Sequence, residues 1–135
     1  MLGYARNAIS AYQKAGVEAA VEVADPYRLV LLLFEGAQAA IGAARAAIQQ
    51  NNIRVKGESI SKAIDIISNG LKASLDAEKG GDLAARLESL YDYMVLRLLQ
   101  ANLKSDDKAL EEVSGLIGEL LSAWREISPA KVAAA

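Results

Sequence analysis

Apolar side chains recur along most of this chain at spacings of three and four residues, the period of an amphipathic helix. Four such stretches follow one another between residues 25 and 128, and none shows the strict alternation typical of a strand. The only two prolines, at positions 26 and 129, stand at the two ends of this patterned region, where they interrupt no helix. The pattern predicts an all-α protein.

The first two stretches have clear start and stop signals. A helix is expected to begin at Asp25-Pro26, because aspartate is a good N-cap and proline suits the first helical position. The polar run QQNN at 49–52 ends it, and a second helix covers 53–77. Lys79-Gly80-Gly81-Asp82 then favours a helix end followed by a new N-cap. The expected core positions are Val30, Phe34, Ala37, Ile41, Ala44, Ile48, Ile60, Ile64, Ile67, Leu71 and Leu75.

The third helix is expected over 83–103, and the fourth from Ser105 or Asp106 to the residues before Ser128-Pro129. Short linkers force neighbouring helices to run antiparallel. The sequence therefore predicts an antiparallel up-down four-helix bundle over 25–128. Its further core positions are Leu83, Leu87, Leu90, Tyr91, Met94, Val95, Leu98, Ala101, Leu110, Val113, Ile117, Leu120, Leu121, Trp124 and Ile127.

The two ends of the chain lack this pattern. Residues 1–24 are expected to form a mobile segment with a short helix near 4–14 and an extended part, and 129–135 a disordered tail. The start MLGYARNAIS does not have the layout of a secretory signal. The longest apolar run, Leu29 to Phe34, is far shorter than the roughly 20 residues of a transmembrane helix. We therefore expect a cytoplasmic protein without membrane insertion.

Composition narrows the chemistry. The 135 residues include no histidine and no cysteine, which removes the commonest general base and metal ligand and all thiol chemistry. A net charge of −2 does not indicate a nucleic-acid-binding protein. The carboxylate pairs Asp106-Asp107 and Glu111-Glu112 point about 100° apart on a helix, which favours capping and solvation over metal binding. We expect no enzyme, no cofactor and no metal, and a binding function instead.

Several apolar residues do not fit the core faces. An isolated exposed leucine is ordinary, but a contiguous apolar surface marks a binding site, and a groove between helices accepts a partner's amphipathic helix. On wheels of about 100° per residue, the residues that lie away from the core stripes are Leu31, Leu32, Val55, Ile66, Ala73, Leu96, Leu99 and Leu103.

Four further residues are candidates for this surface. Tyr93 lies off the core stripe of its helix and is expected to be exposed. Asn102 lies at the edge of the core face, where it either fixes the helix register as a buried polar group or belongs to a recognition site. Ile9 and Tyr12 have no place in the bundle and are candidates to cover the surface when no partner is bound. The predicted partner-binding set is Val55, Ile66, Ala73, Tyr93, Leu96, Leu99, Asn102 and Leu103.

An ordered set of motifs identifies a possible family. The segments AYQ at 11–13, DPYRLVLLLFEGA at 25–37, KGESISKAIDIISNGLKASLD at 56–76, GGDLA at 80–84, LYDYMVLRLLQANLKSD at 90–106, LEEV at 110–113 and AWREI at 123–127 closely resemble the flagellin export chaperones, the FliS family. The resemblance covers residues 11–128. It implies a cytoplasmic helical bundle that binds the disordered C-terminal region of flagellin, prevents early polymerisation and aids delivery to the flagellar type III export gate.

The resemblance also implies details of the site. The N-terminal segment of the family is thought to cover part of the client surface, which places this role on Ile9 and Tyr12. The family usually has two basic residues where this chain has Leu96-Arg97, so Leu96 carries less weight than Leu99 and Leu103. A co-chaperone or regulator is a further partner that this family resemblance leaves open.

A second class of function is a self-associating bundle or an adaptor for another amphipathic helix. In this reading the apolar arc is a homodimer interface. Sedimentation on dilution and binding to flagellin distinguish the two hypotheses.

Overall fold

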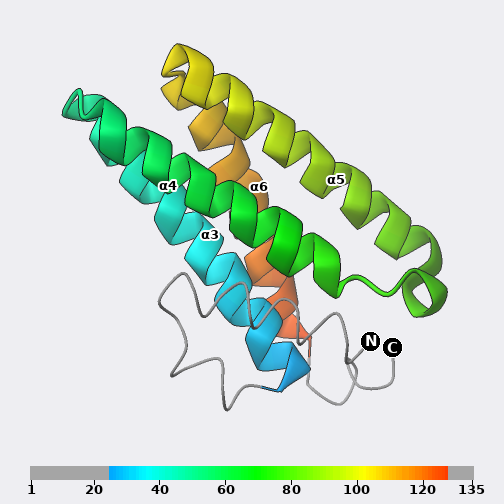
Figure 1. The fold of residues 1–135 in the computed structure, drawn as a ribbon. Coiled ribbons are helices and arrows are strands. Elements are labelled where there is room, and N and C mark those ends of the chain that lie inside the picture. The colour runs from blue at the N-terminus through cyan, green and yellow to red at the C-terminus, as the bar shows by residue number, and fades with distance from the viewer. Residues whose placement is uncertain (1–24, 128–135) are drawn as a thin grey trace.

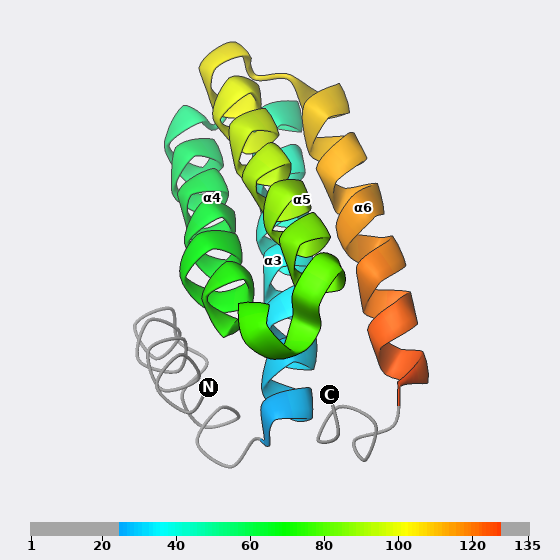
Figure 2. The same cartoon turned by 90° about the vertical axis from the view of Figure 1, so that its right-hand side faces the viewer.

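The computed structural model describes residues 25–127, and within this range the chain forms only helices and short turns (Figure 1). The helices alternate in direction as predicted, so that both the α3–α4 and the α5–α6 turns lie at one end of the bundle (Figures 1 and 2). The predicted mobile segment 1–24 and tail 129–135 lie outside the described residues. The elements are α3 (Pro26–Gln49), α4 (Ile53–Asp65), the π-helix η1 (Ile66–Leu71), the 3₁₀ turn η2 (Lys72–Ser74), α5 (Ala77–Lys104) and α6 (Asp107–Glu126).

Side-chain caps lie at the starts of α3, α4 and α6, and two of them, Asp25 and Asp106, were predicted. The Asp25 side chain accepts a hydrogen bond from the Arg28 backbone N–H at 2.7 Å, with Pro26 in the first helical position. Asn52 caps α4 and Asp106 caps α6 in the same way. The fourth start differs from the prediction.

Helix α5 begins after Asp76, not after Asp82. The Asp76 carboxylate accepts hydrogen bonds from the backbone N–H groups of Glu78 and Lys79. The predicted break at the glycines is a kink inside α5, where Gly81 has φ +51°, a conformation that glycine adopts without steric cost. The glycines therefore do interrupt the helix geometry, but α5 already begins at the upstream cap, Asp76.

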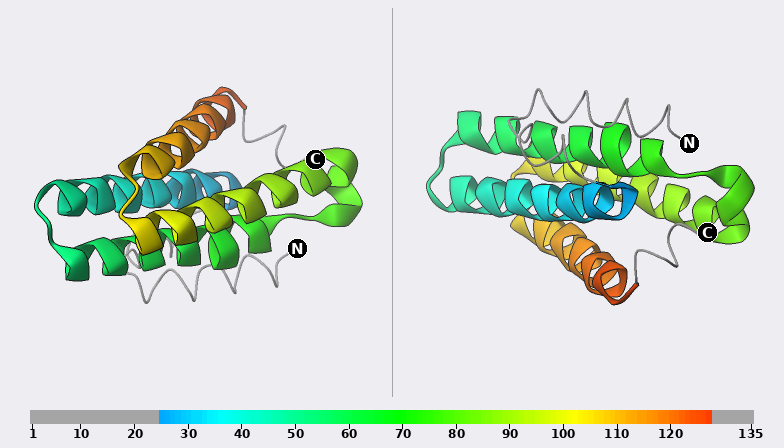
Figure 3. Two further views of the ribbon diagram at one scale, coloured as in Figure 1. Left: turned by 90° about the horizontal axis from the view of Figure 1, so that it is seen from above. Right: turned by 90° about the horizontal axis from the view of Figure 1, so that it is seen from below.

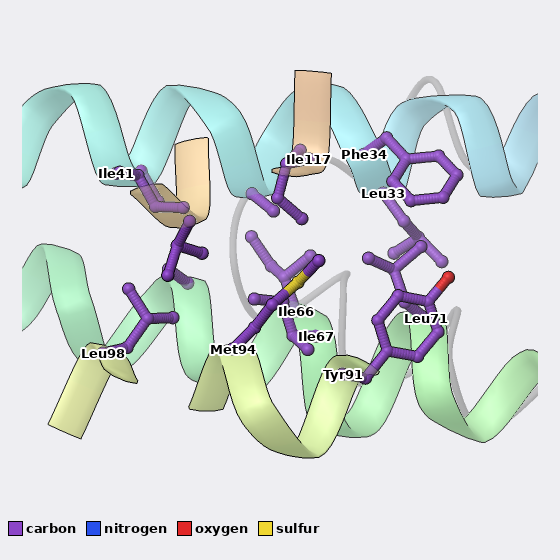
Figure 4. Packing of buried hydrophobic residues seen from close by; sticks show 14 of the residues in the cluster. Leu33, Phe34, Ile41, Ile66, Ile67, Leu71, Tyr91, Met94, Leu98 and Ile117 are labelled. Atoms are coloured by element: carbon purple, nitrogen blue, oxygen red, sulfur yellow. The ribbon is translucent and has the colours of Figure 1, made fainter. Parts of the chain in front are cut away.

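Apolar side chains from all four helices meet in one core (Figure 4). Many of the predicted core residues are fully buried there, and burial raises the pKa of the Tyr91 hydroxyl. Leu31 was predicted to be spare but is buried, and Leu32 packs against the core. The residues labelled in Figure 4 are Leu33, Phe34, Ile41, Ile66, Ile67, Leu71, Tyr91, Met94, Leu98 and Ile117.

Helix α3 is long and apolar enough to cross a membrane by length and composition alone. The core helix of a soluble protein passes the same test. Nine residues of α3 are buried against the rest of the bundle, and this burial accounts for its apolar character.

Helix α6 runs at a marked angle to the other three helices and diverges from α5 toward its own C-terminus (Figure 3). That end is attached to α3: the Trp124 ring stacks on Tyr27 with 5.7 Å between centroids, and its indole N–H donates to the Tyr27 carbonyl. Arg125 also pairs with Glu35 at 3.0 Å. Because α6 leaves α5, Leu83 near the start of α5 is 65% exposed, and its predicted place in the core was wrong.

The prediction that Ile66 is exposed was also wrong, since only 1% of it is accessible. Ile53, the first residue of this helix, is itself 75% exposed. The buried face runs instead through Lys56, Ile60 and Ala63, and this rotation carries Ile66 inward. From Ile66 onward the chain is a π-helix, whose i→i+5 hydrogen bonds also break the period assumed for a regular α-helix.

Candidate functional site

Exposed large apolar side chains concentrate on one helix. Of the six found among the described residues, all but Ile53 lie on α5. Leu96, Leu99 and Leu103 are 53%, 54% and 84% exposed. They fall within roughly 60° of arc at 3.6 residues per turn, so they form one ridge along the C-terminal half of α5. We call Leu96, Leu99 and Leu103 the outer strip.

On the side toward α6, a hydrogen-bonded network borders the outer strip. The Glu112 carboxylate accepts from the Tyr93 hydroxyl and from Arg97 Nε, each at 2.7 Å, and Arg97 also donates to Gln100. The hydrogen bond from Tyr93, followed by that from Arg97, lowers the pKa of Glu112. This network ties the exposed face of α5 to α6 and gives the apolar strip a polar edge.

Toward the N-terminus of α5, the strip ends at an ion pair. Asp92 accepts a hydrogen bond from Lys72 of η2 at 2.7 Å, and this bond raises the pKa of Lys72. Beyond the pair lies a groove of about 1030 Å³ between η1–η2 and the first turns of α5. Mostly small side chains line it, Ala73 and Ala84 among them, so a partner's backbone can approach closely.

The other end of the strip rests on α4 through a buried lysine. Lys56 is only 7% exposed, and its ammonium donates to the Asn102 carbonyl at 3.0 Å and to Ser105 Oγ at 2.7 Å. It thereby satisfies one of the free carbonyls at the C-terminal end of α5, next to Leu103. A hollow of about 170 Å³ opens beside it, lined by Ala47, Ile48, Asn51, Asn52, Ile53, Lys56 and Ser105.

The structure brings most of the predicted site residues to the surface of α5 and its neighbours. Tyr93 is exposed as predicted, and Val55, Ala73 and Asn102 are partly exposed. Ile66 lies in the core and cannot contact a partner while the bundle is closed. Ile9 and Tyr12 lie outside the described residues, and contact of any of these side chains with a partner stays a prediction.

Sequence reasoning missed two residues of this region, Ile53 and Lys56. Ile53 follows the Asn51-Asn52 turn directly, and a residue in the first turn of a helix has few neighbours. Lys56 shares its face with Ile60 and Ala63, at helical spacing, so the pattern did contain the signal for its burial. A lysine is usually expected to be exposed, because a buried ammonium is rare without a partner.

The capping expected of the carboxylate pairs of α6 holds for Asp106, whereas the other three carboxylates form ion pairs. Asp106 caps the helix, and Asp107 and Glu111 both pair with Arg45 of α3, at 2.9 and 3.5 Å. The hydrogen bond from Arg45 lowers the pKa of Asp107. Across residues 25–127, no three acidic side chains come together in a group that could hold a metal ion.

Known proteins resemble this chain along nearly its whole length. The family model described as Flagellar protein FliS matches residues 8–131. The flagellar secretion chaperone FliS of Salmonella typhimurium is 52% identical over 126 residues, 93% of each chain. The FliS chaperone of Escherichia coli is 47% identical over 131 residues, 96% of each chain. The flagellar secretion chaperone FliSB of Pseudomonas aeruginosa is 45% identical over 125 residues, 93% of this chain and 98% of that protein. The chain therefore belongs to the FliS family of flagellar secretion chaperones.

Proposed function

We propose that this protein binds the C-terminal segment of flagellin in the cytoplasm, prevents it from polymerising early and aids its delivery to the flagellar export gate. Family membership supports a role in flagellar secretion. The observation that supports a client surface is the outer strip, three leucines that stay exposed on a helix held firmly by its neighbours. The client's amphipathic helix lays its apolar face on this strip.

The magnitudes favour weak, reversible binding. Covering a leucine side chain contributes about 1.5–3 kcal/mol, so three leucines contribute about 5–9 kcal/mol at most. Ordering a disordered client costs roughly 2–5 kcal/mol or more. The strip alone therefore gives modest affinity, and the client extends onto further surfaces, such as the groove around Ala73. Such a complex separates without ATP, and the proposed function is non-enzymatic.

Two flagellin samples test this proposal. Flagellin from Salmonella typhimurium, the source of the 52% identical relative, is compared with the same protein lacking about 40 C-terminal residues, roughly 60 Å of helix. We expect the full-length protein to bind and the truncated one to lose most of its affinity. Equal binding of both samples would exclude the C-terminal segment as the client.

The N-terminal segment is the proposed competitor for the same surface. Ile9 and Tyr12 are apolar residues that precede the first helix of the bundle, and they offer the strip an intramolecular cover. Such a cover lowers the apparent affinity for the client and keeps the leucines from associating with other proteins.

A second candidate function is self-association through the outer strip, with the protein as a scaffold or adaptor. The exposure of Leu103 supports this candidate too, because a homodimer would cover this side chain as well as a client helix would. Sedimentation over a dilution series distinguishes the two: a stable dimer that ignores flagellin supports the second candidate.

A further inference from the structure

The hollow beside Lys56 contains a buried ammonium group, and none of its lining residues in the described part of the chain is acidic. A lysine ammonium has three N–H donors, and the two hydrogen bonds of Lys56 both go to neutral oxygens. No ion pair involves Lys56 within residues 25–127, although buried charges are usually paired. The first turn of α4, whose N-terminus opens here, contains no acidic residue either. The N-terminus of α4 adds partial positive charge and the C-terminal ends of α3 and α5 add partial negative charge, so the full charge of the hollow comes from the lysine.

The walls of the hollow fit a small carboxylate-bearing group. Ser105 accepts from Lys56 and keeps its own hydroxyl hydrogen to donate, and Ile48 and Ile53 provide an apolar side. The hollow of about 170 Å³ is large enough for several water molecules. This is enough space for one carboxylate and part of the residue that carries it.

The hollow continues the outer strip. Lys56 binds the carbonyl of Asn102, the residue before Leu103, and the highly exposed Ile53 forms part of the hollow. A helix whose apolar face covers Leu96, Leu99 and Leu103 therefore ends over Lys56. The C-terminal end of a helix carries partial negative charge, so the positive hollow selects one of the two directions in which such a helix can lie.

We propose that this hollow binds the C-terminal carboxylate of the client, an inference that rests on the proposed function. The free carboxylate of the last client residue accepts hydrogen bonds from the third N–H of Lys56 and from the Ser105 hydroxyl. The final helix of the client then lies along the outer strip with its C-terminus at the α3–α4 turn. The site recognises the C-terminal carboxylate of the client and thereby fixes both the register and the direction in which the client helix lies on the strip.

The test uses two synthetic peptides with the sequence of the last 40 or so residues of Salmonella typhimurium flagellin, roughly 60 Å as a helix, one ending in a free carboxylate and one in an amide. Titration calorimetry measures the affinity of each peptide for the unmodified protein, so no folding defect can interfere. We expect the amide to bind about tenfold more weakly, as for loss of a charge-assisted hydrogen bond. Lys56→Met, checked for its helical circular dichroism spectrum, should bind both peptides equally.

Each outcome decides the proposal. Equal affinity of acid and amide for the unmodified protein would overturn the carboxylate site and leave flagellin binding intact. A preference for the acid that persists in Lys56→Met would place the carboxylate elsewhere. If neither peptide binds, the proposed function fails and the carboxylate site with it.

Discussion

One substitution made at two positions of α5 separates the client surface from the core. Leu98 is fully buried, whereas Leu103 is the most exposed leucine of the outer strip. Leu98→Asp removes a core side chain and buries a carboxylate without a partner, which costs more than about 4 kcal/mol. Because a domain of this size is stable by about 5–15 kcal/mol, this variant should be largely unfolded or strongly destabilised.

Leu103→Asp should leave the bundle folded. An exposed substitution changes the unfolding free energy by about 0.5 kcal/mol, and a negative charge at a helix C-terminus adds roughly 0.3–1 kcal/mol. The melting temperature should therefore fall by less than about 10 °C. Flagellin binding should weaken by about 10- to 100-fold, because one leucine no longer contributes its 1.5–3 kcal/mol.

Thermal unfolding followed by circular dichroism and calorimetric titration with flagellin measure the two effects. Ile64, a core position predicted from the sequence, is only partly buried, so Leu98 is the stricter control. A melting temperature that collapses in Leu103→Asp would place this residue in the core. Unchanged flagellin affinity in a folded Leu103→Asp would remove it from the client surface.

Three further predictions address the rest of the molecule. The pKa of Glu112 is lowered from its ordinary value of 4.5, so its hydrogen bonds stabilise the fold above that pH and are lost as the pH falls below it. In an acid titration, Glu112→Gln should therefore lose less stability than the unmodified protein does. An acid transition that is the same in both proteins would contradict this. A methyl group at Gly57 contacts no other atom, so Gly57→Ala should raise the unfolding free energy by about 0.5–1 kcal/mol. Gly70→Val should lower it by about 1–3 kcal/mol, because a Cβ there lies 2.8 Å from Leu33 Cδ2. Denaturant titration measures both variants, and equal effects would refute the packing argument. Tyr12→Ala should keep the melting temperature and raise flagellin affinity, and an unchanged affinity would exclude Tyr12 as a cover.

Local signals predicted the helices well because each depends on few residues. Aspartates at 25 and 106 cap helices by bonding N–H groups within three residues, and the polar 49–52 turn ends α3 as expected. The choice between two caps for α5 was not decided by the sequence. Asp76 and Asp82 are both good caps, and glycine at 81 tolerates a kink that keeps the two parts together.

Packing errors came from interactions between distant parts of the chain. A wheel cannot show that α6 turns away to join Tyr27, which uncovers Leu83. It also cannot show that α4 contacts both α3 and α5, so that its buried face reaches Ile66 and includes the charged Lys56. The outer strip was predictable because it lies opposite the core on a regular part of α5, where a helical wheel gives the correct direction of each side chain.

The central claim is that the outer strip contacts the C-terminal segment of flagellin, and site-specific photocrosslinking tests it most directly. A photoreactive residue replaces Leu99 in one variant and Ala43, an exposed residue of α3, in a control. After irradiation with full-length flagellin, mass spectrometry of the crosslinked peptides should find flagellin's C-terminal segment attached at position 99 and little product at position 43. A complex that forms normally but crosslinks at position 43 and not at position 99 would contradict the account.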